Sequence, residues 1–331
     1  MDARTNSILK HVAILALLLS VLVFVLVHFH IVSCNFFTPI GCDIYYSLIG
    51  TGKPKILIVS GSQGLGNPDY LYEVLRSPNI RGNVGIRELE VVSLPLLREN
   101  QLVIVERARQ MCTEDLEMFM EYVNTGGKLV WIGDAGTEGC GFDREAGGYS
   151  TSDFLSEQER YGGESVELIG PWARKSGDNQ VSFDTVLGVN YKANYCELAD
   201  CGLFERTGTF EFVDQDKQLV YGLGQDLPFF GDFAIVAISK EGYQTSLAYM
   251  DNEFDLVAEP KVPHPWLSEE RQNFGRDFPV IVSSGVGGRV AYYAFPPEFF
   301  VSNAMPIDER TGQRIAYWAL MENLYYGMLY K

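Results

Sequence analysis

The segment from Met111 to Gly136 constrains the fold of this chain more than any other. Acids fill the first turn of an expected helix that Thr113 is suited to cap, because the amino end of a helix favours negative charge. Gly126 and Gly127 end that helix, and the apolar run 129–132 predicts a short, fully buried strand since no polar residue alternates in it. Helix, glycine turn and buried strand in this order indicate one unit of a parallel α/β sheet.

The residues after that strand are the first candidates for a site. Ligands usually bind at the carboxyl ends of parallel strands, so we expect Gly133, Asp134, Ala135 and Gly136 to contribute to ligand binding. Asp134 is the candidate catalytic residue, as a covalent nucleophile or a general base. The acids that could pair with it for hydrolysis of a glycoside are Glu138, Asp143 and Glu145. The alternative is that Asp134 accepts hydrogen bonds from loop amides.

An apolar stretch near the start of the chain predicts a membrane anchor. Residues 12–33 reach roughly the 20 residues that a helix needs to cross a bilayer. Arg4 and Lys10 precede the stretch and no basic residue follows until Lys53, so residues 1–11 are expected in the cytoplasm and the remainder outside. His28 and His30 are then interface residues rather than metal ligands. Residues 34–52 form a linker, and residues 53–331 form the folded domain.

A cleaved signal is the alternative to an anchor. The sequence Ile31-Val32-Ser33-Cys34 resembles a bacterial lipobox, in which the cysteine is lipidated. The apolar core is longer than the 7 to 15 residues usual for a signal region, which favours the uncleaved anchor. Both possibilities tether the domain outside the membrane.

An extracytoplasmic domain changes how its six cysteines are interpreted. In an oxidising compartment an even number of cysteines indicates disulfides. Short loops would be closed by Cys34 with Cys42 and by Cys196 with Cys201, while Cys112 and Cys140 follow two strands expected to be neighbours. No spacing is C-x-x-C, so we expect no zinc site and no other metal or cofactor.

Net charge narrows the partners. The chain carries 43 acids against 26 bases, a formal charge of -17, and has no basic cluster along its sequence that could follow a phosphate backbone. Nucleic acid is therefore excluded as an expected partner. The membrane, other cell-surface proteins and a small-molecule or carbohydrate ligand remain.

The rest of the chain extends the α/β pattern. Strands are expected at 56–59, near 89–93 and at 102–105, with a helix at 68–76. The glycine-rich turn after the first strand offers Gly61, Ser62 and Gln63 as further ligand-binding candidates, although its spacing is neither a P-loop nor G-x-G-x-x-G and a tight turn without ligand is the alternative. A long excursion, with a helix at 152–160, covers residues 137–180.

The last third of the chain predicts antiparallel strands. Hairpins are expected at 209–213 with 218–221, at 233–239 with 245–249, and at 278–283 with 288–295. A closing helix is expected at 311–329. The whole is a flavodoxin-like, doubly wound, mainly parallel sheet with antiparallel strands at its carboxyl-terminal end, preceded by one transmembrane helix.

Four segments resemble the class I glutamine amidotransferase-like superfamily, in the branch of ThuA-like and PfpI-like domains: Lys55–Gly61, Leu102–Val105, Gly126–Gly133 and Gly288–Pro297. The resemblance implies the doubly wound fold. Catalytic members carry a cysteine at the elbow after the fourth strand, with a histidine and an acid further on. Here Asp134 stands at that elbow.

The catalytic pair of that superfamily is not recognisable in this chain. Cys140 lies too far past the elbow, and His264 sits in Val-Pro-His-Pro without a following acid pattern. The sequence therefore favours a membrane-anchored interaction or ligand-binding module over an enzyme. An extracytoplasmic hydrolase that uses Asp134, and a lipidated binding protein anchored at Cys34, are the alternatives.

Overall fold

The computed structural model describes most of the chain. The described residues are 3–28, 44, 53–78, 80–139, 169–176, 179–202, 206–213, 219–221, 223, 227–239, 245–284, 288–301 and 318–329. The expected helix at 152–160, the 285–287 turn, and Cys34, Cys42 and Cys140 lie outside these residues. So do Asp143 and Glu145.

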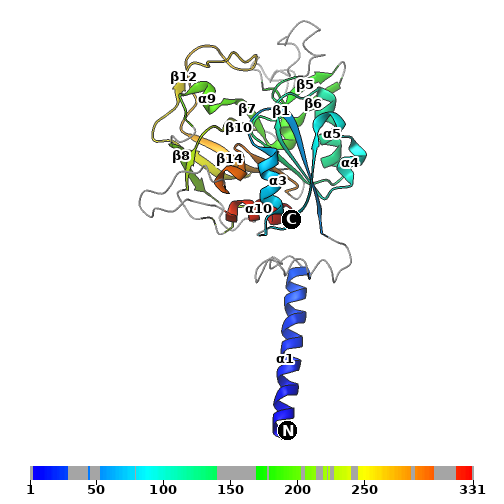
Figure 1. The fold of residues 1–331 in the computed structure, drawn as a ribbon. Coiled ribbons are helices and arrows are strands. Elements are labelled where there is room, and N and C mark those ends of the chain that lie inside the picture. The colour runs from blue at the N-terminus through cyan, green and yellow to red at the C-terminus, as the bar shows by residue number, and fades with distance from the viewer. Residues whose placement is uncertain are drawn as a thin grey trace.

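Helix α1 (Ala3–His28) covers most of the predicted anchor. Its segment Leu9–Leu26 has a mean hydropathy of 2.6, and no residue of it is fully buried, although Val23 and Phe24 are partly buried against the domain. By length and composition this helix can cross a membrane. Figure 1 shows it projecting away from a single folded domain.

A nine-stranded sheet organises that domain, with the strand order β2-β1-β3-β4-β15-β14-β11-β8-β9. The first five strands in this order are parallel, and the remaining neighbours pair antiparallel. The fold class predicted from the sequence is therefore confirmed. The strands are β1 (Lys55–Gln63), β2 (Asn83–Glu88), β3 (Leu102–Ala108), β4 (Leu129–Ile132), β8 (Arg206–Phe212), β9 (Leu227–Phe230), β11 (Thr245–Asp251), β14 (Asp277–Ser284) and β15 (Val290–Tyr293).

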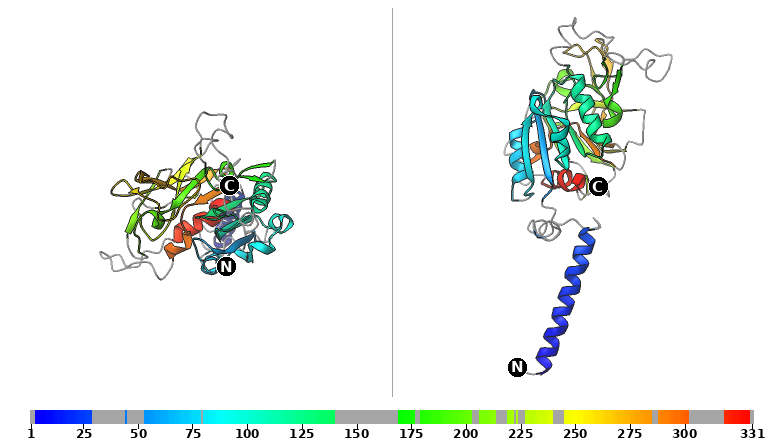
Figure 2. Two further views of the ribbon diagram at one scale, coloured as in Figure 1. Left: turned by 90° about the horizontal axis from the view of Figure 1, so that it is seen from above. Right: turned by 90° about the vertical axis from the view of Figure 1, so that its right-hand side faces the viewer.

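Three small two-stranded sheets accompany the large one: β7 (Val189–Asn194) with β10 (Ala234–Ile238), β5 (Ala173–Ser176) with β6 (Asn179–Ser182), and β12 (Val257–Ala258) with β13 (Gln272–Asn273). Strand β10 also contacts β14, so the β7–β10 pair lies beside the large sheet. In Figure 2 these elements gather at the end of the domain farther from α1.

Helices cover the parallel half of the sheet. Contacts join α3 (Pro68–Arg76) to the 3-10 helix η2 (Pro297–Val301) and η2 to α10 (Trp318–Leu329), and they join α4 (Leu94–Arg98) to α5 (Thr113–Asn124) and α5 to α8 (Phe183–Leu187). Two further short helices in the described residues are η1 (Leu89–Val91) and α9 (Tyr195–Leu198). Strand β4 is buried at all four positions, as its unbroken apolar sequence predicts.

Several local predictions were wrong. The second strand is Asn83–Glu88 rather than 89–93, because the run Leu89–Val91 turns into a 3-10 helix while the more polar segment pairs with β1 as the edge strand. The helix at 113 is capped by Cys112, since the Asp115 carboxylate accepts the Cys112 N–H at 2.9 Å, and Thr113 is the first helical residue.

Two predicted hairpins were also wrong in their partners. Strand β8 pairs with β9 and β11, and residues 219–221 form a turn. Strand β10 pairs with β7, whereas β11 pairs with β14 and β8. Alternating apolar residues identified the strands but not their neighbours, because side-chain periodicity contains no information about which strand lies alongside. The third hairpin, β14 with β15, is confirmed.

Candidate functional site

The loop after β4 forms a tight, buried elbow. Gly133 and Gly136 have φ angles of 61° and 68°, a backbone region that glycine adopts without strain. Side chains from other elements satisfy the carbonyls of this loop: the Tyr292 hydroxyl donates to Gly133 O at 3.0 Å, and Arg174 Nη2 donates to Gly136 O at 2.6 Å. Gly133, Asp134, Ala135 and Gly136, the ligand-binding candidates at this edge, are all buried.

Tryptophans close the same elbow. The indole N–H groups of Trp131 and Trp172 both donate to Ala135 O at 2.9 Å. Trp172 itself is 1% exposed and packs edge-on against Tyr292. The backbone of the elbow therefore points its acceptors into the protein.

Asp134 has its carboxylate committed to the interior. The side chain is 1% exposed, Oδ1 accepts the Leu65 N–H at 2.8 Å, and Oδ2 accepts the Asn194 Nδ2–H at 3.0 Å. Arg109 Nη1 lies 3.6 Å from Oδ2. Two hydrogen bonds and a nearby cation hold this buried carboxyl group in place, as the burial of a polar side chain requires.

Arg109 is the centre of the polar network around Asp134. Its Nε lies 2.9 Å from Glu138 Oε1, and its Nη2 donates to Glu197 Oε1 at 2.9 Å. Burial alone would lower the pKa of Arg109, but Tyr191, Asp134 and Glu197 outweigh burial and raise the pKa. The Arg109 guanidinium therefore lies among the carboxyl groups of Asp134, Glu138 and Glu197 and offsets part of their negative charge.

Glu197 connects this network to His264. Glu197 Oε2 lies 2.9 Å from His264 Nε2 and also accepts the Asn194 N–H at 3.1 Å. Burial opposes ionisation, but the hydrogen bonds from His264 and Asn194 prevail and lower the pKa of Glu197 to about 2. His264 stacks on Trp266, with ring centroids 4.9 Å apart. The only His in the described domain thus serves Glu197 and not a cysteine.

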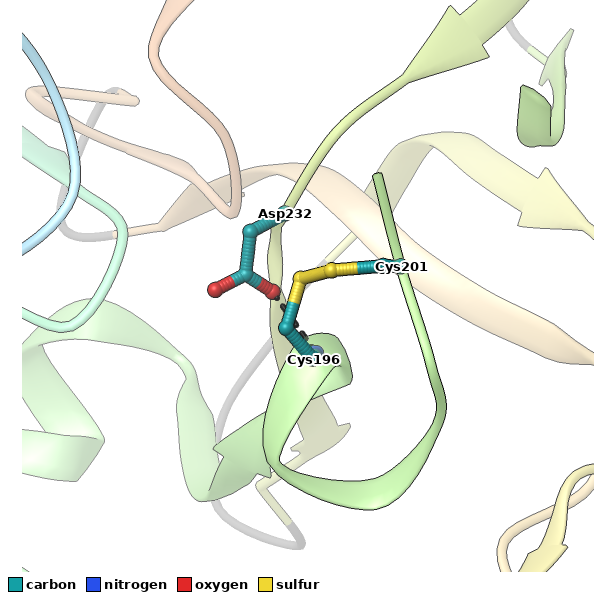
Figure 3. Close-up of side chains that lie close together, drawn as sticks. All are labelled: Cys196, Cys201 and Asp232. Carbon is teal, nitrogen blue, oxygen red and sulfur yellow. Dashed lines mark hydrogen bonds between the residues drawn. A yellow bond between two sulfur atoms is a disulfide. The ribbon is translucent and has the colours of Figure 1, made fainter. Parts of the chain in front are cut away.

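Asp232 lies beside a disulfide (Figure 3). Cys196 and Cys201 form one of the predicted bridges. Asp232 Oδ1 accepts the N–H groups of Cys196 and Phe233 at 2.9 and 3.0 Å. The pKa of Asp232 is raised to about 6, first by burial and then by the charges of Asp134 and Glu197. Ligand atoms of the two cysteines and Asp232 lie within 4.8 Å of one another, but bonded sulfurs are poor metal ligands.

Cys112 is also disulfide-bonded. Its predicted partner, Cys140, lies outside the described residues, so that pairing stays a prediction, as does the pairing of Cys34 with Cys42. Bridges are typical of proteins in an oxidising compartment, and the bridge between Cys196 and Cys201 is consistent with that location.

A second pair of acids, Glu106 and Glu298, is wholly buried below the glycine-rich turn. Both are 0% exposed, and Glu298 Oε1 accepts the Asn67 N–H at 2.9 Å. Burial raises the pKa of both, that of Glu298 to about 7, and the two carboxyls also interact with each other. Placing two negative charges side by side in a buried position costs much free energy, so the two carboxyls are expected to share a proton.

The glycine-rich turn thus gives two of its amides to carboxylates of the protein itself. Leu65 donates to Asp134, and Asn67 donates to Glu298. Gly61 packs closely against β3, since a Cβ there would lie 2.9 Å from Ala108 Cα. Ser62 and Gln63 are exposed at the end of β1. The ligand-binding role of Gly61, Ser62 and Gln63 stays a prediction.

A groove of about 640 Å³ opens next to the network. Trp266 and Phe274 contribute aromatic surface, and Lys192, Asn273 and Asp277 contribute polar groups. Because Trp266 stacks on His264, a chain of contacts runs from the groove through Glu197 and Arg109 to Asp134.

Sequence reasoning singled out Asp134, whose catalytic role stays a prediction, but it missed most of the residues that surround this side chain. Asn194, Glu197 and Asp232 come from segments 60 or more positions away along the chain. The alternation of Val189, Tyr191 and Ala193 with polar residues was a usable signal for β7, after which Asn194 and Glu197 would have been candidates at a strand end.

Comparison with known proteins gives distant structural likenesses. No family model and no curated protein matches the chain. A ThuA-like protein from Bacteroides uniformis is similar over 83% of this chain and 90% of its own, with 13% identity and a TM-score of 0.48. A ThuA-like protein from Parabacteroides merdae gives 83% and 88% coverage, 14% identity and a TM-score of 0.39.

A β-galactosidase from Rahnella sp. R3 is similar over 86% of this chain, with 13% identity and a TM-score of 0.45. The chain spans about a third of that enzyme, 34% of its length. At these identities and scores, the likenesses do not establish a family or an activity.

Proposed function

We propose that this protein is a membrane-anchored, extracytoplasmic ligand-binding module of amidotransferase-like fold. The main observation behind this proposal is that the Asp134 carboxylate is buried and hydrogen-bonded to groups of the protein itself. A nucleophile or general base must reach a substrate, whereas this carboxylate is 1% exposed and accepts hydrogen bonds from Leu65 and Asn194. Helix α1 and the bridge between Cys196 and Cys201 support anchorage and an exported location.

The groove beside Trp266 is the binding surface in this proposal. Its combination of aromatic surface with amide, ammonium and carboxylate groups suits a polar organic ligand, a saccharide included. A partner protein could insert a loop there as well.

A hydrolase is the second candidate, favoured by one observation. Asp232 has a pKa raised to about 6 and lies close to Asp134 and Glu197, and a carboxyl with such a pKa can act as a general acid. In this case Asp134→Asn and Asp232→Asn would each abolish hydrolysis.

Asp134→Asn separates the two candidates. The variant loses the contact between Arg109 and the Asp134 carboxylate whichever candidate holds, so the full-length protein in detergent should melt several degrees lower. For a hydrolase, activity on a panel of glycosides and esters should also vanish at temperatures where the variant is still folded, whereas a binding module has no such activity to lose. Hydrolysis by the wild type that Asp134→Asn removes would refute the module.

A thermal-shift screen of saccharides and amino acids tests the groove. Compounds that stabilise the full-length wild type should lose their effect in Phe274→Ala and Asp277→Asn, which alter the groove. Asp69→Asn, on the exposed start of α3, is the matched control and should retain the shift.

A further inference from the structure

Basic residues gather at the edge of the sheet where the parallel strands begin. The register places the starts of β1, β2, β3, β4 and β15 side by side, because Lys55 pairs with Asn83, Ile56 with Leu102, and Leu129 with both Val103 and Val290. The residues that precede or open these strands include Lys53, Lys55, Arg81, Arg98, Lys128 and Arg289, a set called here the basic edge.

This edge departs from the charge of the chain as a whole. Acids outnumber bases by 43 to 26 in the whole chain. In the described segments that lead into these strands, the six basic residues are accompanied by two acids, Glu99 and Glu121. Glu121 pairs with Arg98 at 3.0 Å, with both side chains exposed. The basic edge therefore carries net positive charge on an otherwise acidic protein.

Lys128 and Arg289 are the most closely associated cations of this edge. They precede neighbouring strands, and the backbone N–H of Leu129 donates to Arg289 O at 2.9 Å. Burial lowers the pKa of Lys128, and the charge of Arg289 lowers it further. Lys128 Nζ donates to Leu329 O at the end of α10, which fixes the position of its ammonium group. Within the described residues, no carboxylate forms an ion pair with Arg289.

A cavity of about 460 Å³ lies at this position. Its polar lining includes Arg98, Asn100, Gln101, Thr125 and Lys128. Arg289 reaches the same place, since its Nη1 would be 3.8 Å from a Cβ added to Gly126, which also lines the cavity. Cationic and neutral donors around one cavity are the groups that bind a phosphate monoanion.

The basic edge also faces the anchor. In Figure 1 the start of β1 and helix α10 lie at the end of the domain nearest α1, and the second view in Figure 2 agrees. We propose that the basic edge docks on anionic phospholipids of the leaflet from which the domain emerges, with a headgroup phosphate bound between Lys128 and Arg289. This inference rests on the membrane anchorage proposed above. A negative bilayer surface attracts the basic edge and repels the acidic remainder, so docking orients the groove away from the membrane.

Hydrogen–deuterium exchange of the full-length protein in nanodiscs tests this inference. The discs contain either phosphatidylcholine alone or phosphatidylcholine with a third of phosphatidylglycerol. With phosphatidylglycerol, amides of residues 124–129 and 288–290 should exchange at least threefold more slowly, and 0.5 M NaCl should remove most of that protection.

Two variants and one control make the test specific. Arg289→Gln should lose the protection, and Lys55→Gln, at an exposed position, should weaken it. Lys261→Gln is the control, because Lys261 pairs with exposed Asp200 away from this edge and its loss should leave the protection intact. Equal exchange in both kinds of disc, or full protection in Arg289→Gln, would overturn the proposal.

Two further measurements distinguish lipid docking from binding of free phosphate and from a failed anchor. Inorganic phosphate at 10 mM, added to phosphatidylcholine discs, should not reproduce the protection; if it does, the cavity is a site for free phosphate and the lipid proposal is wrong. Co-purification of the protein with the discs reports anchorage by α1 independently of exchange, so failure of the docking and failure of the anchor are distinguishable.

Discussion

Glu106→Gln should make the protein less sensitive to rising pH. In the wild type, Glu298 has a pKa of about 7 in the folded protein against an ordinary value of 4.5, and that of Glu106 is raised well above its ordinary value. The unfolded chain releases these protons near pH 4.5, whereas the folded protein retains them. Stability from the pair is therefore complete below pH 4.5 and is lost as pH rises through 7.

The raised pKa of Glu298 shows the scale of the effect. Raising a carboxyl pKa from 4.5 to about 7 corresponds to about 3 kcal/mol, and burial is the first cause of the raised pKa at both Glu298 and Glu106. The introduced glutamine removes the Glu106 carboxyl and therefore the free-energy cost of ionising it, while Glu298 keeps the cost of its own burial. The variant should therefore exceed the wild type by about 2 kcal/mol at pH 8.5.

The assay is the melting temperature of the full-length protein in detergent at half-unit steps from pH 4.5 to 8.5. At about 2 to 4 °C per kcal/mol, Glu106→Gln should melt roughly 4 to 8 °C above the wild type at pH 8.5 and close to it at pH 5. Asp232 also loses stability across this range, but it is present in both proteins and cancels in the difference. Arg107, which favours ionised Glu106, and Tyr70, which faces Glu298, are likewise unchanged.

Glu73→Gln, on the exposed face of α3, is the control for removing a carboxylate and should follow the wild-type profile. Parallel profiles for wild type and Glu106→Gln would refute the reasoning, because they would show that the buried pair does not hold an extra proton.

The other two predictions concern the Arg109 network and the bridge between Cys196 and Cys201. Arg109→Gln leaves Asp134, Glu138 and Glu197 without their shared cation, so it should lower the free energy of unfolding by about 3 kcal/mol at pH 7.5. Lowering the pH to 5 or adding millimolar Ca²⁺ should restore part of the melting temperature of this variant, and no response to either would contradict the charge argument. Changing both Cys196 and Cys201 to serine removes a bridge of sequence separation 5 and should cost about 2 kcal/mol of stability. A calorimetric melting temperature unchanged within 1 °C would show that this bridge does not constrain the unfolded chain.

Local signals in the sequence predicted the helices and strands whose ends are chemically marked. Helix α3 begins and ends as predicted, because Asn67 caps it through its side chain and Pro68 fits its first turn. Strand β4 is recognisable because both of its faces are buried. Strand β2 was placed wrongly because an edge strand with polar residues resembles a loop. The apolar residues of the following segment, Leu89–Val91, are typical of a strand, but this segment forms a 3-10 helix.

The candidate site divides in the same way. Position in a parallel sheet was enough to single out Asp134, since strand ends meet at one edge whatever the rest of the chain does. Its hydrogen-bond partners come from β7 and from the loop after β1, and long-range packing brings them together. No local pattern states that Asn194 faces Asp134, or that Glu106 and Glu298 meet across 192 positions of sequence.

Strand polarity links the two charged edges of the domain. In a parallel sheet, residues that precede strands share one edge and residues that follow strands share the other. Lys128 and Arg289 precede β4 and β15, whereas Asp134 and Glu138 follow β4. An anchor joined to the chain before β1 is therefore joined to the basic edge, and the Arg109 network and its groove are placed at the far side. Under the proposed topology, the direction of the parallel strands relative to the anchor places the basic edge near the lipid and exposes the binding groove to solvent. If the anchor instead followed β15, the acidic edge would face an anionic bilayer and be repelled by it.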